Sequence, residues 1–183
     1  MAKVYEFLAN GFEDVEALAP VDILRRGGVE VVTVSITASH SVETSHGVTV
    51  EADRHIADVD LSDADLLILP GGMPGATNLM ESESVCSALK AQNEAGRLIG
   101  AICAAPMVLG KLGILNGKRA TCYPGFDQYL DGATYTGEMV TVDGNIITGK
   151  GPGAAMAFGY QLLSAFVTEQ EVEALKKGMI YDG

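Results

Sequence analysis

The segment that decides the fold is Leu98-Ile99-Gly100-Ala101-Ile102-Cys103-Ala104-Ala105-Pro106. Its first half has the continuous apolar character of a buried strand, and a stretch with helical patterning follows the cysteine. A nucleophile presented on a sharp strand-to-helix turn needs small residues two positions before and after it, because backbone segments approach closely there. Ala101 and Ala105 meet this requirement. The segment therefore predicts a nucleophile elbow with Cys103 at its tip.

On both sides of this segment, short apolar runs rich in β-branched residues alternate with helical patterns. This alternation is typical of βα units wound on a parallel sheet, so we expect an α/β fold. The expected strands are 3–9, 30–36, 46–52, 66–69, 98–102, 119–122, 139–142 and 145–148, the last two joined by an Asp-Gly hairpin turn. The expected helices are 14–26, 82–95, 104–112, 154–167 and 169–177. Because 183 residues without a linker or internal repeat suit one domain, residues 1–183 are expected to form a single domain.

The charge balance limits the partners. With 12 Lys+Arg against 24 Asp+Glu, the formal net charge is −12, which repels phosphate backbones and anionic membrane surfaces. The chain has no run approaching the ~18 apolar residues of a membrane helix and no signal pattern at its start. We therefore expect a folded cytoplasmic protein that binds neither nucleic acid nor membranes.

The three cysteines show neither Cys-x-x-Cys spacing nor proximity in sequence to a histidine, which disfavours a disulfide framework and a metal site. Cys86 and Cys122 are not on an elbow, and we interpret both as structural, although Cys122 could be a second redox thiol. Cys103 could be only a small buried hydrophobe. Its place at the carboxyl end of a strand favours function instead. A helix start beside the sulfur would lower its pKa, so Cys103 is predicted to have the lowest thiol pKa and to react first with peroxide.

A nucleophile needs a partner that moves protons, and Glu16 is the candidate. At ~100° per residue, Glu16 lies in the middle of an apolar arc of its predicted helix, together with Val15, Ala19, Pro20, Ile23 and Leu24. A carboxyl group turned inward would have a raised pKa and could share a proton with a thiolate. The alternative is a solvated first-turn acid, which Pro20 favours because a proline there would kink the helix. A Cys-His pair using His40, His46 or His55 is a further alternative, which their polar, turn-like contexts disfavour.

Two glycine-containing loops follow predicted strands. In Leu69-Pro70-Gly71-Gly72, the glycines would let backbone N–H groups approach a reacting oxygen, although an ordinary loop would look similar. In Gly149-Lys150-Gly151-Pro152-Gly153-Ala154, the spacing matches a dinucleotide-binding pattern, but no acid ends a second strand downstream. We interpret this loop as a strand-to-helix turn near the site, with Gly151 and Pro152 lining it, and expect no cofactor.

Taken together, these motifs resemble the ThiJ/PfpI superfamily, and within it the branch of the parkinsonism-associated protein deglycase and YajL-like bacterial proteins. The motifs that carry the resemblance occur in order along nearly the whole chain: 11–16, 20–28, 69–72, 101–106 and 151–153. The resemblance implies a flavodoxin-like three-layer sandwich, with a mostly parallel sheet and helices on both faces, related to class I glutamine amidotransferases. It also implies a homodimer and an oxidisable cysteine beside a protonated glutamate.

Carried over by position, Cys103 would be the nucleophile and Glu16 its acid–base partner, with N–H groups of Gly72 and Ala104 as oxyanion donors. Ala104 stands where the peptidase-like branch has a histidine, which disfavours proteolysis. Tyr123 stands where close relatives often carry a site histidine, so a proton relay through that position is in question. His46 occupies a position that is often basic in relatives, near the dimer interface.

Two classes of function follow from the resemblance. As an enzyme, the protein would convert a small 2-oxoaldehyde such as methylglyoxal into a hydroxy acid, or remove such groups from glycated protein, without a cofactor. As a non-enzymatic redox sensor and chaperone, it would act through oxidation of Cys103. Thiazole monophosphate synthesis, another label of the family, gains no support because the chain shows no phosphate-binding motif.

Overall fold

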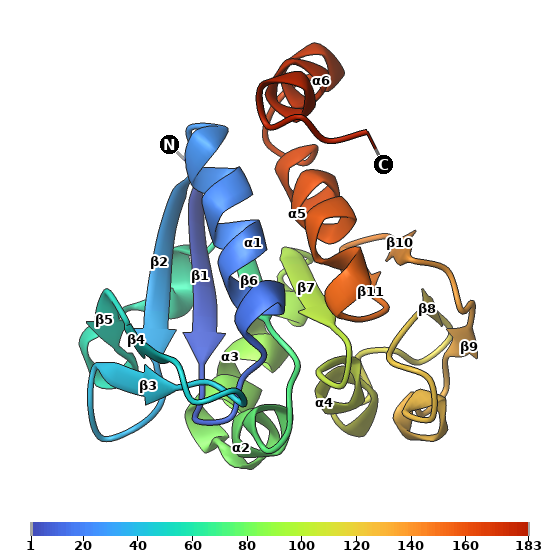
Figure 1. The fold of residues 1–183 in the computed structure, drawn as a ribbon. Helices are drawn as coiled ribbons and strands as arrows, with labels where there is room; N and C mark the ends of the chain where they lie inside the picture. Colours follow the sequence, from blue (N-terminus) through green and yellow to red (C-terminus); the bar gives the residue numbers. More distant parts are fainter. Residues whose placement is uncertain (1, 183) are drawn as a thin grey trace.

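The computed structural model describes residues 2–182, which form a seven-stranded sheet with helices on both sides (Figure 1). The sheet strands are β1 (Lys3–Leu8), β2 (Glu30–Ser35), β5 (Arg54–His55), β6 (Leu66–Leu69), β7 (Leu98–Ile102), β10 (Val140–Asp143) and β11 (Ile146–Gly149). Their order is β10-β11-β7-β6-β1-β2-β5, and neighbours run parallel except for the β10–β11 hairpin. The predicted flavodoxin-like α/β fold is therefore confirmed.

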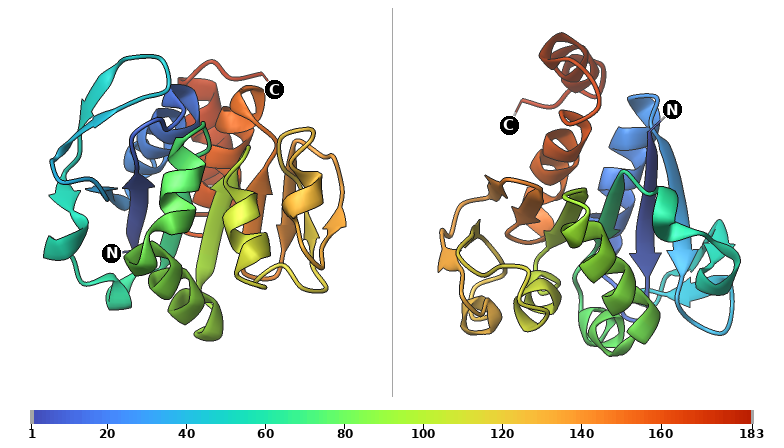
Figure 2. Two further views of the ribbon diagram at one scale, coloured as in Figure 1. Left: turned by 90° about the horizontal axis from the view of Figure 1, so that it is seen from below. Right: turned by 180° about the vertical axis from the view of Figure 1, so that it is seen from behind.

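Two layers of helices cover this sheet (Figures 1 and 2). The helices are α1 (Asp14–Arg26), α2 (Gly75–Glu81), α3 (Glu83–Glu94), α4 (Pro106–Lys111), α5 (Ala155–Leu163) and α6 (Glu169–Gly178). Helices α1 and α5 pack together on one face, while α3 covers the other and α2 contacts both α3 and α4. Among residues 2–182, no helix combines the length and apolar character that crossing a membrane requires.

The remaining elements are short. They are β3 (Ser41–Glu43), β4 (Thr49–Glu51), β8 (Arg119–Ala120), β9 (Thr134–Tyr135) and the 3-10 helices η1 (Ile56–Asp58), η2 (Leu61–Asp63), η3 (Asp127–Tyr129) and η4 (Pro152–Ala154). The strand predicted over 46–52 is shorter than expected, since only β4 lies within it, and its antiparallel partner β3 was not predicted. The two are joined by a turn in which Gly47 has a φ of 77°. Helix α2 was missed, and α5 ends earlier than predicted.

A glycine in β7 sets the distance between that strand and α5. A Cβ atom at Gly100 would lie 3.0 Å from Leu162 Cδ2 and 3.1 Å from Phe158 Cζ, both on α5. Such a contact is tighter than side chains normally tolerate. The absence of a side chain therefore lets α5 pack directly on the strand that leads to Cys103.

Among residues 2–182, the core contains a carboxyl group that has no hydrogen-bond partner at either oxygen. Glu6, on β1, is fully buried, and neither of its carboxyl oxygens has a hydrogen-bond partner. Burial raises the pKa of Glu6 well above its ordinary value of 4.5, and the positive charge of Arg25 only partly opposes this. The folded protein therefore keeps a proton on Glu6 that the unfolded chain would release.

We expect Glu6→Val to stabilise the fold by about 1–3 kcal/mol, because it removes an unsatisfied polar group from the core. Above the unfolded pKa, the folded state binds more protons at this site than the unfolded state, so wild-type stability falls as pH rises. Urea unfolding at pH 5 and pH 8 checks both points. Glu6→Gln cannot ionise but stays polar, so it should lose the pH dependence while gaining less unfolding free energy than Glu6→Val. A Glu6→Val protein that is less stable than wild type at pH 8 would contradict this explanation.

Candidate active site

Three adjacent strands, β1, β6 and β7, end at the same edge of the sheet. The chain after β1 supplies Glu16 on α1, the chain after β6 supplies Gly71 and Gly72, and the chain after β7 supplies Cys103. Open α/β sheets bind ligands beyond the carboxyl ends of their strands. Segments far apart in the sequence are thus brought to the edge where this fold places its sites.

Cys103 has a left-handed backbone conformation, with a φ of 65°. Its N–H group donates to the Gly149 carbonyl (2.9 Å), and its own carbonyl accepts from the Tyr123 N–H (2.9 Å). A non-glycine residue in this region is strained by about 1–3 kcal/mol, and such strain concentrates at functional sites. The two hydrogen bonds from neighbouring segments hold Cys103 in this conformation, with 8% of the residue exposed.

The helix after Cys103 begins later than predicted. Ala104 and Ala105 belong to a turn, and α4 starts at Pro106 and is six residues long. The expected effect of a helix dipole on the sulfur is weakened accordingly. The backbone N–H groups of Gly72 and Ala104 lie near the sulfur instead and partly oppose the increase in its pKa.

Glu16 lies on the inward face of α1 and is fully buried. The buried face differs from the predicted arc, because Ala17 and Val21 are buried whereas Val15 is 49% exposed. Pro20 lies inside α1, which nevertheless continues to Arg26. Proline has no N–H group to donate to the Glu16 carbonyl four residues earlier, so the helix keeps its course without that bond.

The carboxyl group of Glu16 contacts both other segments of the site. Its Oε2 atom accepts a hydrogen bond from the Gly71 N–H (3.0 Å), while Oε1 has no hydrogen-bond partner. The Cys103 side chain lies on the other side of Gly71, close enough that each of the two groups shifts the pKa of the other. The side chain therefore bridges the chain after β6 and the candidate nucleophile.

Glu16 and Cys103 share their protons. Burial raises the pKa of Glu16 to about 7, an increase that its contact with Cys103 partly opposes. Burial also raises the pKa of the Cys103 thiol, and the nearby Glu16 charge raises it further. Two negative charges this close are unfavourable, so above a pH of about 7 the pair holds one proton and one charge, and below it the pair holds two protons. Burial raises the pKa of all three thiols, so the rank of Cys103 among them stays a prediction.

Gly71 fits between these two side chains. A Cβ atom at this position would lie 2.5 Å from Glu16 Oε2 and 2.6 Å from Cys103 Cβ. Gly72 has a φ of 86°, and a Cβ atom there would lie 2.5 Å from the Glu13 nitrogen. Any side chain at either position would separate the segments that form the site.

The residues predicted to line the site lie further out. The Tyr123 ring is next to Gly151, where a Cβ atom would lie 3.2 Å from Tyr123 Cδ2. Tyr123 itself is 47% exposed, and Pro152 begins η4 as an exposed residue. The loop 149–154 joins β11 to η4 and α5, as predicted for a strand-to-helix turn. Tyr123 and Gly151 thus form a rim beside the backbone of Cys103.

The model of the DJ-1/PfpI family matches residues 2–165. The chain belongs to the DJ-1/PfpI family. This confirms the resemblance found in the sequence.

Relatives within the DJ-1/PfpI family match most of the chain. Protein DJ-1 homolog B of Arabidopsis thaliana is 39% identical over 171 residues, which are 92% of this chain but only 39% of that relative. A Caenorhabditis elegans relative named glutathione-independent glyoxalase DJR-1.2 is 34% identical over 167 residues, 90% of this chain and 88% of its own. The solved structure of oxidized Toxoplasma gondii DJ-1 has a TM-score of 0.96 at 34% identity and covers 100% of both chains.

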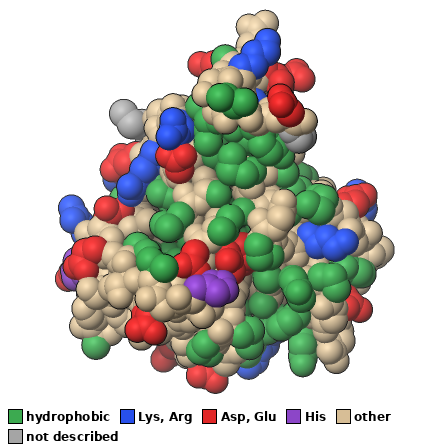
Figure 3. Space-filling view, viewed as in Figure 1, with side chains coloured by type: hydrophobic (Ala, Val, Ile, Leu, Met, Phe, Trp, Pro, Cys, Tyr) green, Lys and Arg blue, Asp and Glu red, His purple; other side chains and the backbone are tan. Residues whose placement is uncertain are grey.

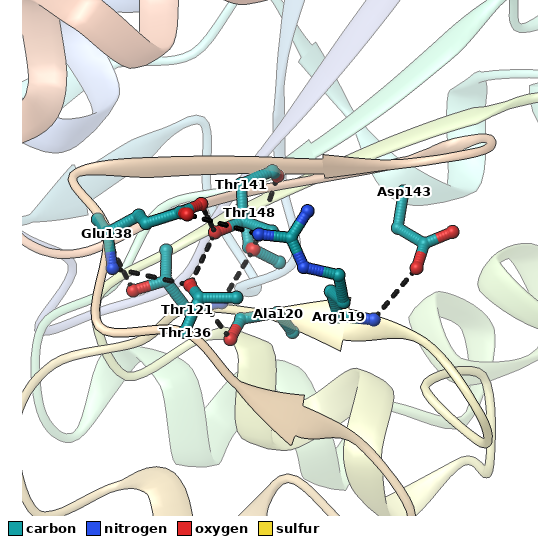
Figure 4. Close-up of polar contacts among 8 residues, drawn as sticks. All are labelled: Arg119, Ala120, Thr121, Thr136, Glu138, Thr141, Asp143 and Thr148. Atoms are coloured by element: carbon teal, nitrogen blue, oxygen red, sulfur yellow. Dashed lines mark hydrogen bonds and ion pairs between the residues drawn. The ribbon is translucent and has the colours of Figure 1, made fainter.

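A threonine network, which the sequence analysis missed, connects two segments that hold Cys103 in this DJ-1/PfpI protein (Figure 4). The Thr148 hydroxyl, next to Gly149, accepts from the Thr121 N–H (2.9 Å). The Thr121 hydroxyl donates to the Glu138 carbonyl (2.7 Å). The network therefore fixes the strand before Tyr123 to β11. Threonine is common in strands, so its presence there gave no signal of this role.

Three side chains of types that often bind metals lie together beside the candidate site, near the start of α1. Glu13, Asp14 and His46 each place one ligand atom within 4.8 Å of the others. Protein groups already engage them: Glu13 accepts from the Glu16 N–H (2.8 Å), and Asp14 pairs with His46 Nδ1 (2.6 Å). That pairing raises the pKa of His46. The residues fit a helix cap and an ion pair without a metal.

Proposed function

We propose that this protein converts small 2-oxoaldehydes such as methylglyoxal into 2-hydroxy acids, with Cys103 as nucleophile and Glu16 as the acid–base group. The observation that carries the proposal is the buried Glu16 carboxyl, with a pKa of about 7, against a strained cysteine. A general acid–base group is most effective when its pKa lies near the working pH. The naming of the C. elegans relative as a glutathione-independent glyoxalase supports the same chemistry.

The reaction begins when the Cys103 thiolate adds to the aldehyde carbon. The carbonyl oxygen gains negative charge, which the N–H groups of Gly72 and Ala104 would stabilise, and then takes up a proton to give a hemithioacetal. Glu16 removes the hydrogen from this carbon as a proton, which gives an enediol, and a proton returns to the neighbouring carbon. The first carbon is thereby oxidised to a thioester and the second reduced to an alcohol. Water cleaves the thioester, which releases the hydroxy acid and restores Cys103, so no cofactor is needed.

The experiment that tests this proposal measures lactate formed from methylglyoxal by metal-free protein. We expect lactate to accumulate with wild type and not with Cys103→Ser, whose hydroxyl is a poor nucleophile at neutral pH. Failure of the wild-type protein to form lactate would contradict the enzymatic proposal.

Glycated protein is a second substrate class for the same site. Addition of Cys103 to the free aldehyde carbon of an early glyoxal adduct is the same first step. Glu16 would then remove the proton from that carbon while the carbon–nitrogen bond breaks and the protein amine leaves, and water would cleave the resulting thioester to release the hydroxy acid. The partly exposed rim at Tyr123 leaves the site accessible from one side. Release of hydroxy acid from a pre-formed, dialysed peptide adduct, faster than adduct decay alone, distinguishes this activity from scavenging of free methylglyoxal.

A redox-sensing role is the second candidate function. The groups around the sulfur, namely the N–H groups of Gly72 and Ala104 and the protonated form of Glu16, are donors that could hold sulfinate oxygens. The similar T. gondii structure is described as oxidized. This role would use the same cysteine without turnover.

We expect stoichiometric peroxide to oxidise Cys103 before Cys86 and Cys122. Cys103 is 8% exposed and has the Glu16 carboxyl beside it to take the thiol proton, whereas Cys122 is fully buried and the Cys86 thiol donates to the Met80 carbonyl (3.2 Å). Peptide mass mapping should find one added oxygen atom on the peptide that contains Cys103 after one equivalent of peroxide per chain, and two after a second equivalent. Earlier modification of either other cysteine would contradict both candidate functions.

We propose a second copy of the chain as a partner, as the family resemblance implies. Hydrophobic side chains gather over α1 and α5 on one face of the molecule (Figure 3). Val15 and Leu18 on α1 are 49% and 40% exposed, and Val48 in the β3–β4 turn is 51% exposed. A two-fold interface across α1 would cover these side chains.

Sedimentation equilibrium at micromolar concentration should give twice the chain mass of 19.1 kDa. Leu18→Glu should shift the protein toward monomer, because it places a charge in the proposed interface. Val142→Glu is the control, since Val142 is 44% exposed on β10, away from α1. A wild-type protein found only as monomer would contradict the proposal.

A further inference from the structure

A cavity of about 580 Å³ lies between α2, α4 and the segment of η3. Its apolar lining consists of Met73, Met80, Met107, Phe126 and Tyr129. Its volume falls within the range of small-molecule sites, which are typically apolar with a few polar groups. Nothing in the chemistry described so far uses this cavity.

Three walls of the cavity continue from segments that hold the candidate nucleophile. Met73 follows Gly71 and Gly72, and a Cβ atom at Gly71 would lie 2.6 Å from Cys103 Cβ. Met107 lies in the first turn of α4, which begins three residues after Cys103. The Phe126 ring packs edge-on against Tyr123 (6.4 Å between centroids), and the Tyr123 N–H donates to the Cys103 carbonyl. Three parts of the cavity wall are therefore continuous with, or packed against, segments that hold Cys103.

The lining favours a flat, uncharged ligand. Methionine thioethers are polarisable and flexible, and they make favourable contacts with aromatic rings. Phe126 and Tyr129 already pack together (5.8 Å between centroids) and offer further ring surfaces. The lining also contains one cation, Lys111, and one carboxylate, Asp131, so its formal charge balances. An anionic ligand would gain from one of these groups and be repelled by the other.

We infer that this cavity binds the aromatic arm of an aryl-substituted 2-oxoaldehyde whose aldehyde carbon reaches Cys103. The inference rests on the proposed function and extends it, because it names a substrate class that the small site at the sulfur would not by itself select. The probe is phenylglyoxal, compared with methylglyoxal, which has a methyl group in place of the ring.

Thr77→Phe tests the inference in turnover. Thr77 lines the cavity from α2, and its hydroxyl contacts Met73 Sδ (3.9 Å), so a phenyl ring there would fill the space. We expect the ratio of kcat/KM for phenylglyoxal over methylglyoxal to fall about tenfold, within the range that hydrophobic pockets discriminate. Ser87→Phe adds the same ring at an exposed position of α3 and should leave the ratio unchanged. An unchanged ratio in Thr77→Phe would overturn the inference.

A binding measurement separates this inference from the proposed function. Acetophenone, an aryl ketone without an aldehyde group, is added to Cys103→Ser protein labelled at its methionine methyl groups. Saturable NMR shifts are expected for Met73, Met80 and Met107 and not for Met156 or Met179, which lie outside the cavity lining. These shifts without lactate formation by wild type would refute the proposed function and support the cavity as an aryl site. Lactate formation by wild type without these shifts would support the proposed function and overturn the aryl site.

Discussion

Replacing Glu16 by glutamine is expected to lower kcat/KM for methylglyoxal by about 10²–10⁴-fold, the usual contribution of a positioned acid–base group. The amide has the same shape and can still accept from the Gly71 N–H, so the site should stay packed. It cannot take a proton from carbon. Steady-state kinetics of lactate formation checks the size of the effect, and thermal unfolding checks that the variant folds.

The pH profile separates a catalytic effect from a structural one. In wild type, the Glu16–Cys103 pair loses its first proton near the Glu16 pKa of about 7, so kcat/KM should rise with pH through that value. Glu16→Gln should lose this limb. Its Cys103 thiol pKa should also fall, because burial still raises it but the carboxylate charge is gone. Absorbance of the thiolate in the ultraviolet follows the thiol directly.

Asp22→Asn is the matched control for this experiment. Asp22 lies on the same helix and makes an exposed ion pair with Arg26 (2.8 Å), which contributes little in solvent. Its removal should leave kinetics and pH profile unchanged. Full activity in Glu16→Gln, with an unchanged thiol pKa, would contradict a mechanism that uses both residues.

Gly71→Ala is expected to reduce kcat/KM by about 10²-fold or more, because displacements near 1 Å in a site have effects of this size. The new methyl group would lie 2.5 Å from Glu16 Oε2 and 2.6 Å from Cys103 Cβ, so at least one of these residues must move. Since such overpacking also strains the fold by about 1–3 kcal/mol, urea unfolding should accompany the kinetics.

Gly153→Ala makes the same chemical change in the loop that joins β11 to α5. A Cβ atom at Gly153 would have no neighbour within 4 Å, so this variant should keep wild-type activity and stability. Wild-type kinetics in Gly71→Ala would show that the close packing of Gly71, Glu16 and Cys103 is not needed for turnover.

The positions of the central strands along the chain were predictable, because each of these strands has a strong local pattern. Leu66–Leu69 is continuously apolar and buried, and Asp143-Gly144 joins the predicted hairpin. The hairpin of β3 and β4 was not predictable in the same way, since its strands are three residues long and mostly exposed. Helix α2 has seven residues and starts without a side-chain cap, so it carries none of the usual start signals.

The residues of the candidate site that follow directly from the ends of strands were predictable. The elbow motif located Cys103, and the apolar arc of α1 placed Glu16 inside, although the arc was wrong about Val15. The raised pKa of Glu16 was predicted from its inward position, whereas the increase in the pKa of Cys103 was not, because it depends on burial and on the Glu16 charge. The support that Thr148 gives to Thr121 was hidden because it is a contact between residues far apart in sequence.

The left-handed backbone at Cys103 has a consequence for engineering. Glycine adopts a φ of 65° without the penalty of about 1–2 kcal/mol that a side chain incurs, so Cys103→Gly would relieve strain at the elbow. A directed-evolution campaign that rewards only heat resistance would therefore favour loss of the sulfur. Screening for thermostable forms of this protein needs a thiol-dependent readout at every round, or the survivors will be robust scaffolds without the reactive group.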